Sequence, residues 1–527
     1  MVRSIMGAVL GVVAACDAAS AGVTVLARTG QQASWLPAGF VIAPTTPQLG
    51  AGTGRLRFTS NGGYTFYAAC LDPVTQARLV QFVHADSPGG ALAPITLATP
   101  TVQTWDGLTT HYEHSIGTAG QVYSYIYDDQ SYGLRGYAMQ GPFRMVHAGG
   151  VLPGVYQTLA SSMQYSALAY NPRGNSTFVA GFQNNQGASL TGVFYDDGSG
   201  LKLSYSSPRF VTEDSAGSVS MTNDGRVFFR DGNSIVACGS VAPRVVIPGV
   251  GALPGIPGSN SIDKFVGTRS GFATHRVALS GDGHFAAAAR VKINFQPNKQ
   301  ALFGGTIDNV QLIALEGQQA PGLPSGVKYG TMEVFGGDGD GTATAQSVIA
   351  DGGRVAFRTM LTGSAVSTIN DTAVFAGSLD APELIAREGD PAIGAAPGLI
   401  FDDIAPVAIN NSGQVLLTAK FENGVDDSWV GAGLYLHTPG AGLIPALVVG
   451  QYVELAPGDV RRIVSIDPAT GDPSAVSTLS EDGRVATLAG FDDGTVATII
   501  VQVPAPGTCS LMGVVFLLGA KRRRRIG

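Results

Sequence analysis

The residues best suited to metal chemistry lie together at His111-Tyr112-Glu113-His114. A zinc protease places two histidines four residues apart on one helical face, with a glutamate between them. Here the spacing is three in a β-type context, and residues three apart in a strand point to opposite faces. We therefore predict an exposed loop and not a zinc site. The other histidines occur singly, and we predict that they are surface or locally satisfied residues: His84, His147, His275, His284 and His437.

A second arrangement that could bind a metal is the glycine-flanked pair Asp338 and Asp340. Calcium binds several carboxylate and carbonyl oxygens on a tight turn, which this loop could supply. The loop lacks the closing acidic ligand of an EF-hand, and Asp-Gly is a preferred hairpin turn. We favour the turn, with calcium as the alternative, and we predict no other cofactor.

The sequence lacks two short motifs that are typical of enzymes acting on esters or nucleotides. There is no G-x-S-x-G nucleophile elbow, and no phosphate-binding glycine loop followed by lysine and serine or threonine. The chain has 39 acidic and 32 basic residues, and its one basic cluster is the run Lys521-Arg522-Arg523-Arg524-Arg525. Because an acidic body repels phosphate backbones, we predict no nucleic-acid partner.

A polar turn that ends in glycine and leads into an apolar strand occurs eight times. The copies Asn410-Asn411-Ser412-Gly413 and Ser480-Glu481-Asp482-Gly483 are clear examples. Glycine is needed at such a position if the backbone takes a positive φ, as in a type I turn with a bulge. Successive turn glycines are 51 to 70 residues apart, with a mean of 60: Gly63, Gly120, Gly174, Gly225, Gly283, Gly353, Gly413 and Gly483.

A second phrase, clearest at Leu384-Ile385-Ala386-Arg387-Glu388-Gly389, alternates with these turns, and its first copy begins at Val25. Residues 382–439 contain four apolar runs of five to eight residues, bounded by Gly, Pro, Asn or Asp, which indicates strands and turns. Four strands in each of eight units predict an all-β protein, a β-propeller of tandem four-stranded repeats over residues 22–503. We favour eight blades. Seven would result if the unit around Gly120 or Gly225 does not form a full blade.

The N-terminus has the layout of a secretory signal peptide. Met1-Val2-Arg3 is followed by an apolar run from Ile5 to Ala15 and by the small residues Ala19-Ser20-Ala21. We predict a short apolar helix in residues 1–21 and cleavage after Ala21. In the alternative, Val13-Ala14-Ala15-Cys16 resembles a bacterial lipobox, and Cys16 is lipidated. Both interpretations predict export.

The C-terminal residues 504–527 resemble the PEP-CTERM type of bacterial sorting signal. Pro504-Ala505-Pro506-Gly507 precedes an apolar stretch from Cys509 to Ala520, predicted to be a short helix, and the basic cluster follows it. Ala505 replaces the middle glutamate of the family motif. Arginines after an apolar segment stay on the cytoplasmic side. The resemblance implies membrane association, an exosortase-like processing enzyme as partner, and cleavage near residues 504–507.

Together the two repeated phrases resemble the bacterial choice-of-anchor proteins with tandem NxxGxxAF repeats. The copy at Asn410 keeps the asparagine, the glycine and an apolar run, whereas other copies replace the asparagine by Ser, Thr, Gly or Ala. The resemblance covers essentially the whole chain. It implies a secreted protein with one of several alternative anchors, and no known activity.

These observations favour an exported, non-enzymatic protein of the envelope or the extracellular space. We expect a binding or structural propeller associated with exopolysaccharide or surface proteins. The alternative is a secreted hydrolase or lyase that acts on polysaccharide with carboxylates in the central channel of the propeller.

Cys70 and Cys238 make no metal motif, and we favour two buried thiols over a disulfide.

Overall fold

The structure is a computed structural model of the 527-residue chain. It describes residues 22–43, 57–58, 63–72, 74–75, 78–87, 90–94, 112–116, 122–128, 133–138, 146–147, 166–171, 173–183, 189–207, 219–265, 277–294, 298–332, 347–423, 428–467 and 478–503. The terminal segments predicted to be helical lie outside these ranges. No helix within them is long and apolar enough to cross a membrane.

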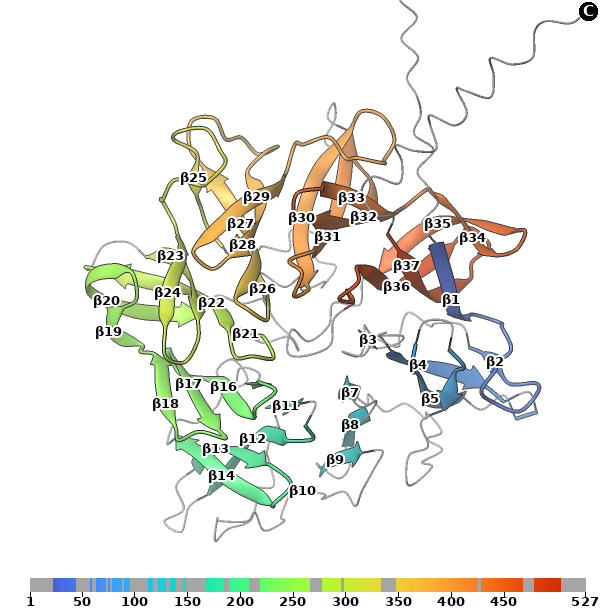
Figure 1. The fold of residues 1–527 in the computed structure, drawn as a ribbon, viewed down its shortest axis with the longest axis horizontal. Coiled ribbons are helices and arrows are strands. Elements are labelled where there is room, and N and C mark those ends of the chain that lie inside the picture. Colours follow the sequence, from blue (N-terminus) through green and yellow to red (C-terminus); the bar gives the residue numbers. More distant parts are fainter. Residues whose placement is uncertain are drawn as a thin grey trace, which may run out of the picture.

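The described residues form 37 strands in eight antiparallel sheets, which are arranged around a common centre as the blades of a β-propeller (Figure 1). The predicted all-β propeller is therefore confirmed, with eight blades. The first four blades contain β2 (Val41–Ile42), β3 (Arg57–Phe58), β4 (Tyr64–Leu71), β5 (Arg78–Ala85) and β6 (Ala93–Pro94); β7 (Tyr112–Ile116), β8 (Val122–Asp128), β9 (Gly133–Ala138) and β10 (Val146–His147); β11 (Ser166–Tyr170), β12 (Ser176–Gln183), β13 (Ser189–Asp196) and β14 (Leu201–Ser207); and β15 (Ser220–Met221), β16 (Arg226–Asp231), β17 (Ser234–Gly239) and β18 (Arg244–Ile247).

Blades 5 to 8 follow in chain order, with six, five, four and five strands. They contain β19 (Val250–Leu253), β20 (Ile256–Phe265), β21 (Ala278–Leu279), β22 (Phe285–Ile293), β23 (Lys299–Gly305) and β24 (Val310–Leu315); β25 (Lys328–Tyr329), β26 (Ser347–Ala350), β27 (Arg354–Thr362), β28 (Thr372–Ser378) and β29 (Ala381–Arg387); β30 (Leu399–Ile409), β31 (Val415–Asn423), β32 (Ser428–Thr438) and β33 (Gly442–Val448); and β34 (Tyr452–Ala456), β35 (Asp459–Asp467), β36 (Arg484–Phe491), β37 (Val496–Gln502) and β1 (Gly22–Arg28).

Blade 7 shows the basic pattern of a blade, with strands A to D running outward from the centre. Strand A is β30, B is β31, C is β32 and D is β33, and each pairs with the next. In blade 6 strand A consists of two pieces, because β25 and β26 both pair with β27. Blades 1 and 5 divide strand A in the same way.

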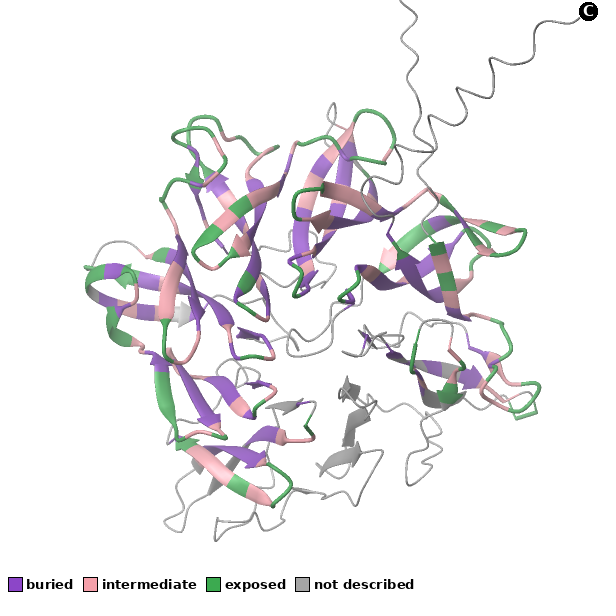
Figure 2. Ribbon diagram, in the orientation of Figure 1, coloured by how far each residue is buried: buried purple, intermediate pink, exposed green. Residues whose placement is uncertain are grey.

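The hydrophobic core is divided into clusters that lie between neighbouring blades. One cluster joins Leu302 of blade 5 to Phe357 and Phe375 of blade 6, and the two phenylalanine rings are 5.7 Å apart. Equivalent clusters connect blades 3 and 4, 4 and 5, 6 and 7, 7 and 8, and 8 and 1. Blades 4 to 8 are therefore buried on both faces, and buried residues follow their strands in Figure 2. This explains why strands such as β31 begin as continuous apolar runs instead of alternating with polar residues.

The first strand of the described chain closes the ring. β1 pairs with β37 as strand D of blade 8, with Gly22 opposite Gln502 and Arg28 opposite Ala497. The same displacement occurs in every unit, because the strand of the Leu-Ile-Ala phrase belongs to the preceding blade. For example, β29 pairs with β28 and not with the strands that follow it. Our grouping of Leu384–Ala386 with the next three strands was wrong, because an apolar run does not encode which neighbour it will pair with.

A cluster of charges at the end of β1 supports this closure. The guanidinium group of Arg28 binds Asp459 and Asp493, each at 2.5 Å, and its Nε donates to Thr495 at 3.0 Å. The hydrogen bond from Arg28 lowers the pKa of Asp459 below its usual range. The N-terminal strand is thereby tied to two further elements of the last blade.

Candidate functional site

The turns between strands A and B lie close to the centre of the ring, and those of blades 3, 4, 5, 7 and 8 have one shared geometry. In blade 6 both Gly352 and Gly353 have a positive φ. We number the residues of each turn 1 to 4, with glycine at position 4. We refer to the described residues of these turns together as the turn ring: residues 171 and 173–174, 222–225, 280–283, 350–353, 410–413 and 480–483. In blade 7 the Gly413 N–H donates to Asn410 O at 2.9 Å, and Asn410 N–H donates to Gln414 O at 3.0 Å. With φ of 80° at Gly413, this is the type I turn with a glycine bulge.

The side chain at position 1 completes the turn locally. Asn410 Oδ1 accepts a hydrogen bond from the Gln414 N–H at 2.9 Å. Thr222 Oγ1 and Ser480 Oγ accept from the equivalent amides at 2.9 and 2.8 Å. Asparagine, threonine and serine therefore serve the same purpose at this position. This equivalence explains why Asn, Ser and Thr alternate at the first position of the repeat.

Among the described turns, those of blades 3 to 7 are each also bonded to the turn of the next blade. The side chain at position 2 accepts a backbone N–H from the preceding blade in three successive contacts. Asp282 N–H donates to Asp351 Oδ1 at 2.9 Å, Asp351 N–H to Asn411 Oδ1 at 3.0 Å, and Asn411 N–H to Glu481 Oε2 at 3.1 Å. These bonds form a continuous chain across blades 5 to 8.

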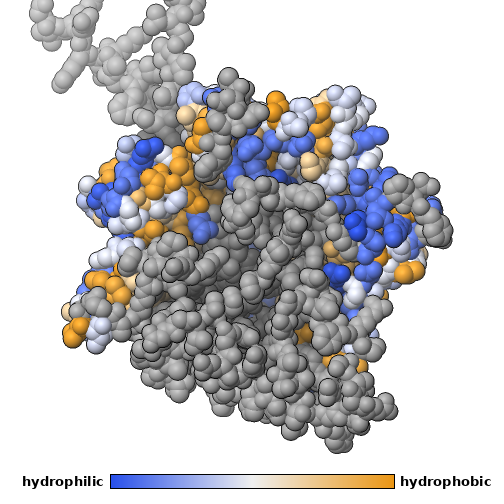
Figure 3. Space-filling model, turned by 180° about the vertical axis from the view of Figure 1, so that it is seen from behind, coloured by the Kyte–Doolittle hydropathy of each residue, from blue (hydrophilic) through white to orange (hydrophobic). Residues whose placement is uncertain are grey.

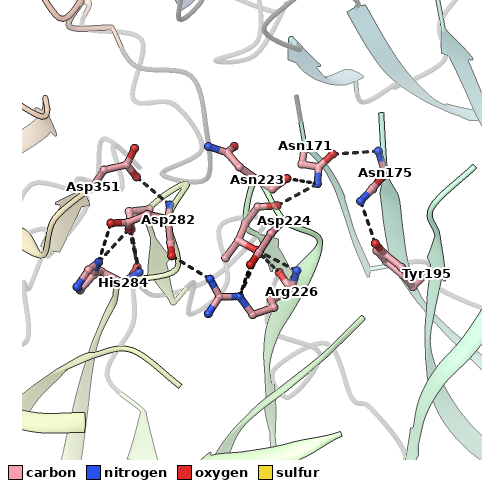
Figure 4. A network of polar contacts seen from close by, with 11 residues as sticks. Asn171, Asn175, Tyr195, Asn223, Asp224, Arg226, Asp282, His284 and Asp351 are labelled. Carbon is pink, nitrogen blue, oxygen red and sulfur yellow. Dashed lines mark hydrogen bonds and ion pairs between the residues drawn. The ribbon is translucent and has the colours of Figure 1, made fainter. Parts of the chain in front are cut away.

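In the other blades the same link uses different atoms (Figure 4). Asn223 N–H donates to the backbone oxygen of Gly281 at 2.8 Å, because glycine offers no side-chain acceptor. Asn171 Nδ2 reaches from blade 3 to Thr222 O and Asn223 O, at 3.0 and 3.2 Å. Asn410 makes the equivalent bond to Ser480 O at 2.9 Å. An asparagine at position 1 thus adds a donor to the next blade that serine and threonine lack.

The turn glycine faces the side chain that follows the preceding turn. A Cβ atom on Gly413 would lie 2.9 Å from Arg354 Nη1, and one on Gly483 would lie 3.0 Å from Gln414. Both glycines have φ of 80°, which L residues rarely adopt. The positive φ therefore calls for glycine, whereas the approach of Arg354 and Gln414 involves the ends of flexible side chains that could move aside.

The carboxylates of the turn ring are occupied by these contacts. Burial raises the pKa of Asp282, but bonds from Gly352 N–H, Ser280 Oγ and His284 outweigh this effect, and the pKa is lowered to about 2. Burial raises the pKa of Glu481, as does the charge of Asp351. Asp282 therefore acts as an ionised acceptor that joins blades 5 and 6.

The second repeated phrase has a separate function at the opposite end of the blades. Glu388 Oε2 accepts the Thr372 N–H at 2.8 Å, and Glu316 Oε2 accepts the Gln300 N–H at 2.9 Å. In each case the glutamate fixes the start of strand C of its own blade. Glu388 is only 7% exposed, and burial together with the neighbouring Asp371 raises its pKa to about 8.

The residues considered as metal ligands in the sequence lie in a strand or outside the described residues. Residues 112–116 form strand β7, so the predicted loop at His111–His114 was wrong for all but His111, which lies outside the described residues. In the described ranges no group of three or more His, Cys, Asp or Glu side chains is arranged to hold a metal. Also outside the described residues are the calcium pair Asp338 and Asp340, the turn glycine Gly120, and the processing residues Ala21, Pro504, Ala505, Pro506 and Gly507.

The remaining candidate cysteines and histidines whose side chains the structure describes are buried, half-buried or in contact with a carboxylate. Cys70 and Cys238 are buried free thiols, and burial raises the pKa of each to about 11. His84 contacts Asp86 at 2.8 Å, and His284 contacts Asp282 within the turn ring at 2.9 Å. Burial lowers the pKa of His437.

Comparison with known proteins identifies similarity but no activity. Residues 251–510, just under half of the chain, match a family of unknown function, DUF7453. A comparison with curated proteins found no match. Similar solved structures include a prolyl endopeptidase (10% identity, TM-score 0.37, 84% of this chain and 55% of that chain), the β-propeller domain of the Trilobed protease from Pyrococcus furiosus (8%, 0.35, 75% and 97%) and the WD40 domain of SCAP from fission yeast (9%, 0.29, 89% and 99%). The chain thus spans about half the length of the endopeptidase.

Substitution of Asn410 separates the local bond of the turn from the bond between blades. N410S keeps a hydroxyl acceptor, as in Ser480, but loses the Nδ2 donor that bonds Ser480 O of blade 8 and Gln414 Oε1, and we expect about 1 kcal/mol of destabilisation. N410A also loses the local acceptor at a buried site, and we expect roughly 2–3 kcal/mol. The control is N370S, because Asn370 makes only a local, exposed bond to Ser367 N–H. Urea unfolding measures all three, and equal midpoints for N410S and the native protein would contradict the contact between blades.

Glu388 gives stability a defined pH dependence. Its pKa is raised from its ordinary value of 4.5 to about 8 in the folded protein, so stability is fully present below pH 4.5 and is lost as pH rises through 8. Gln mimics the protonated side chain, and we expect E388Q to raise Tm at pH 9 but not at pH 4.5. The control is E316Q. Glu316 makes the equivalent bond to the Gln300 N–H in blade 5, but the residue before Gln300 is the basic Lys299, whereas the residue before Thr372 is the acidic Asp371. A pH-independent difference for E388Q would contradict this account.

Proposed function

We propose that this chain is an exported, non-enzymatic propeller of the bacterial envelope or extracellular space. Its task in this proposal is to bind or organise extracellular polysaccharide or surface proteins. The observation that carries the proposal is the use of the repeat's polar residues. Asp282, Asp351, Asn411 and Glu481 bond backbone groups of neighbouring blades, and this use in assembly supports a structural role for the repeat.

The loops at the opposite end of the blades support a binding role for the propeller. This end carries longer connections, among them residues 388–398 between blades 6 and 7 and the hairpin of β34 and β35. Tyr452 and Val460 of that hairpin are 65% and 55% exposed. Loops on a rigid scaffold are the usual location of binding residues. Seen from behind in Figure 3, the described surface is a mosaic of hydrophilic and hydrophobic patches.

Export and anchoring rest on the sequences that flank the propeller. The proposed cleavage after Ala21 would leave Gly22, the first residue of β1, as the new N-terminus. The proline motif of residues 504–507 follows directly after Val503, which is 6% exposed. Both processing positions therefore adjoin the propeller without cutting into a described strand. This position supports an exosortase-like enzyme as a processing partner, with membrane association before cleavage.

Intact-mass spectrometry of the protein from the medium and from the membranes of its host tests export and processing. We expect a secreted form that runs from Gly22 to about Pro504, and a membrane form that keeps the C-terminal segment. A full-length C-terminus in the medium, or a diacylated Cys16, would contradict the sorting proposal.

A binding assay tests the remaining part of the proposed function. We expect the purified propeller to be retained on exopolysaccharide or surface material from its host and to leave the polysaccharide chain length unchanged. Heat-denatured propeller serves as the control. Shortened polysaccharide after incubation would favour the hydrolase or lyase alternative, and no retention on any host material would remove the binding role.

A further inference from the structure

The two ends of the blades differ in the segments that they carry. We call the end with the turn ring and the turns between strands C and D the turn face. In blade 7 it contains residues 410–413 and 438–442, because Ile409 pairs with Val415 and Val415 pairs with His437. The other end, the loop face, contains the start of β30, where Leu399 pairs with Asn423. Since β30 has 11 residues at about 3.3 Å each, the two faces are roughly 30 Å apart.

The chain enters and leaves the propeller at the turn face. Gln502 pairs with both Gly22 and Arg484, and Arg484 directly follows the turn of blade 8. In the other blades a loop joins strand C to strand D, as residues 438–442 do in blade 7. In blade 8 the two chain ends take the place of this turn. The opposite end of β1, at Arg28, reaches the loop face.

The sequence places the apolar C-terminal stretch very close to this exit. Only residues 504–508 separate Val503 from Cys509, where the stretch begins. Five residues reach at most about 18 Å when fully extended. This tether is shorter than the distance between the two faces, so it holds the turn face close to any bilayer that contains the apolar stretch.

We propose that the anchored propeller turns its turn face toward the lipid bilayer and presents its loop face to the surroundings. This inference rests on the proposed C-terminal membrane anchor. It assigns the two faces different partners. The turn face adjoins the lipid headgroups, and the loop face, with the hairpin of β34 and β35, is the surface available to extracellular polysaccharide or protein.

Energy transfer to labelled lipid headgroups tests the orientation. The full chain, with Cys16 and Cys509 changed to serine, is reconstituted in phosphatidylethanolamine and phosphatidylglycerol vesicles that contain a rhodamine headgroup label. A donor dye is attached at A441C on the turn face or at A396C on the loop face. Both alanines are exposed, and the native Cys70 and Cys238 are fully buried. We expect at least twofold more efficient transfer from A441C.

A third reporter, T24C, lies on the exposed outer strand of blade 8 and detects an edge-on arrangement. Equal transfer from A441C and A396C with stronger transfer from T24C would overturn the proposal, as would stronger transfer from A396C. Vesicle flotation is measured first. A chain that does not float overturns the membrane anchor itself, whereas a floating chain with equal or reversed transfer overturns only the orientation.

Discussion

The contact on which this propeller depends is the hydrogen bond from one turn to the turn of the next blade. Hydrophobic clusters hold adjacent blades together, but apolar burial is not directional and does not by itself fix where one sheet stops relative to the next. The bonds Asp282 to Asp351, Asp351 to Asn411 and Asn411 to Glu481 supply that direction. They place successive blades in one register around the centre. The closing strand β1 then joins the last blade to the first residues of the described chain.

This constraint explains the composition of the repeat. In five of the six described turns position 1 is Asn, Ser or Thr, whose side-chain oxygen completes the turn, and blade 6 has Ala350 there. In blades 6 to 8 position 2 carries an acceptor that reaches the previous blade, and position 4 is glycine in all six. Glutamate, aspartate and asparagine all act as the acceptor at position 2. These polar side chains near the centre are therefore already hydrogen-bonded to neighbouring blades. The function of the protein is better sought on the surfaces that the ring holds in place, because loops on a rigid scaffold can vary without disturbing these bonds.

The sequence was sufficient to predict the propeller, its eight units and six of the eight turn glycines, which have a positive φ, because hairpin turns and apolar runs are local signals. It did not reveal that β29 belongs to the preceding blade, since strand pairing is a choice between distant partners. It aligned the turns that begin at Asn410 and Ser480 but did not reveal the hydrogen bond that they share, because that bond depends on one side-chain oxygen and not on residue type. The raised pKa of Glu388 could not be predicted from the sequence either, because only the fold brings Asp371 close to Glu388.

Hydrogen–deuterium exchange of the turn amides tests the central claim most directly. The Asn411 and Asp351 N–H groups lie in exposed turns, yet they donate to the next blade, whereas the Ala441 N–H donates only within its own turn, to Thr438 O. Exchange requires these bonds to open. We predict that peptides covering residues 350–353 and 410–413 exchange far more slowly than a peptide covering 438–442. Equal exchange in the three turns would contradict the account, because the turn ring would then open as freely as an isolated turn.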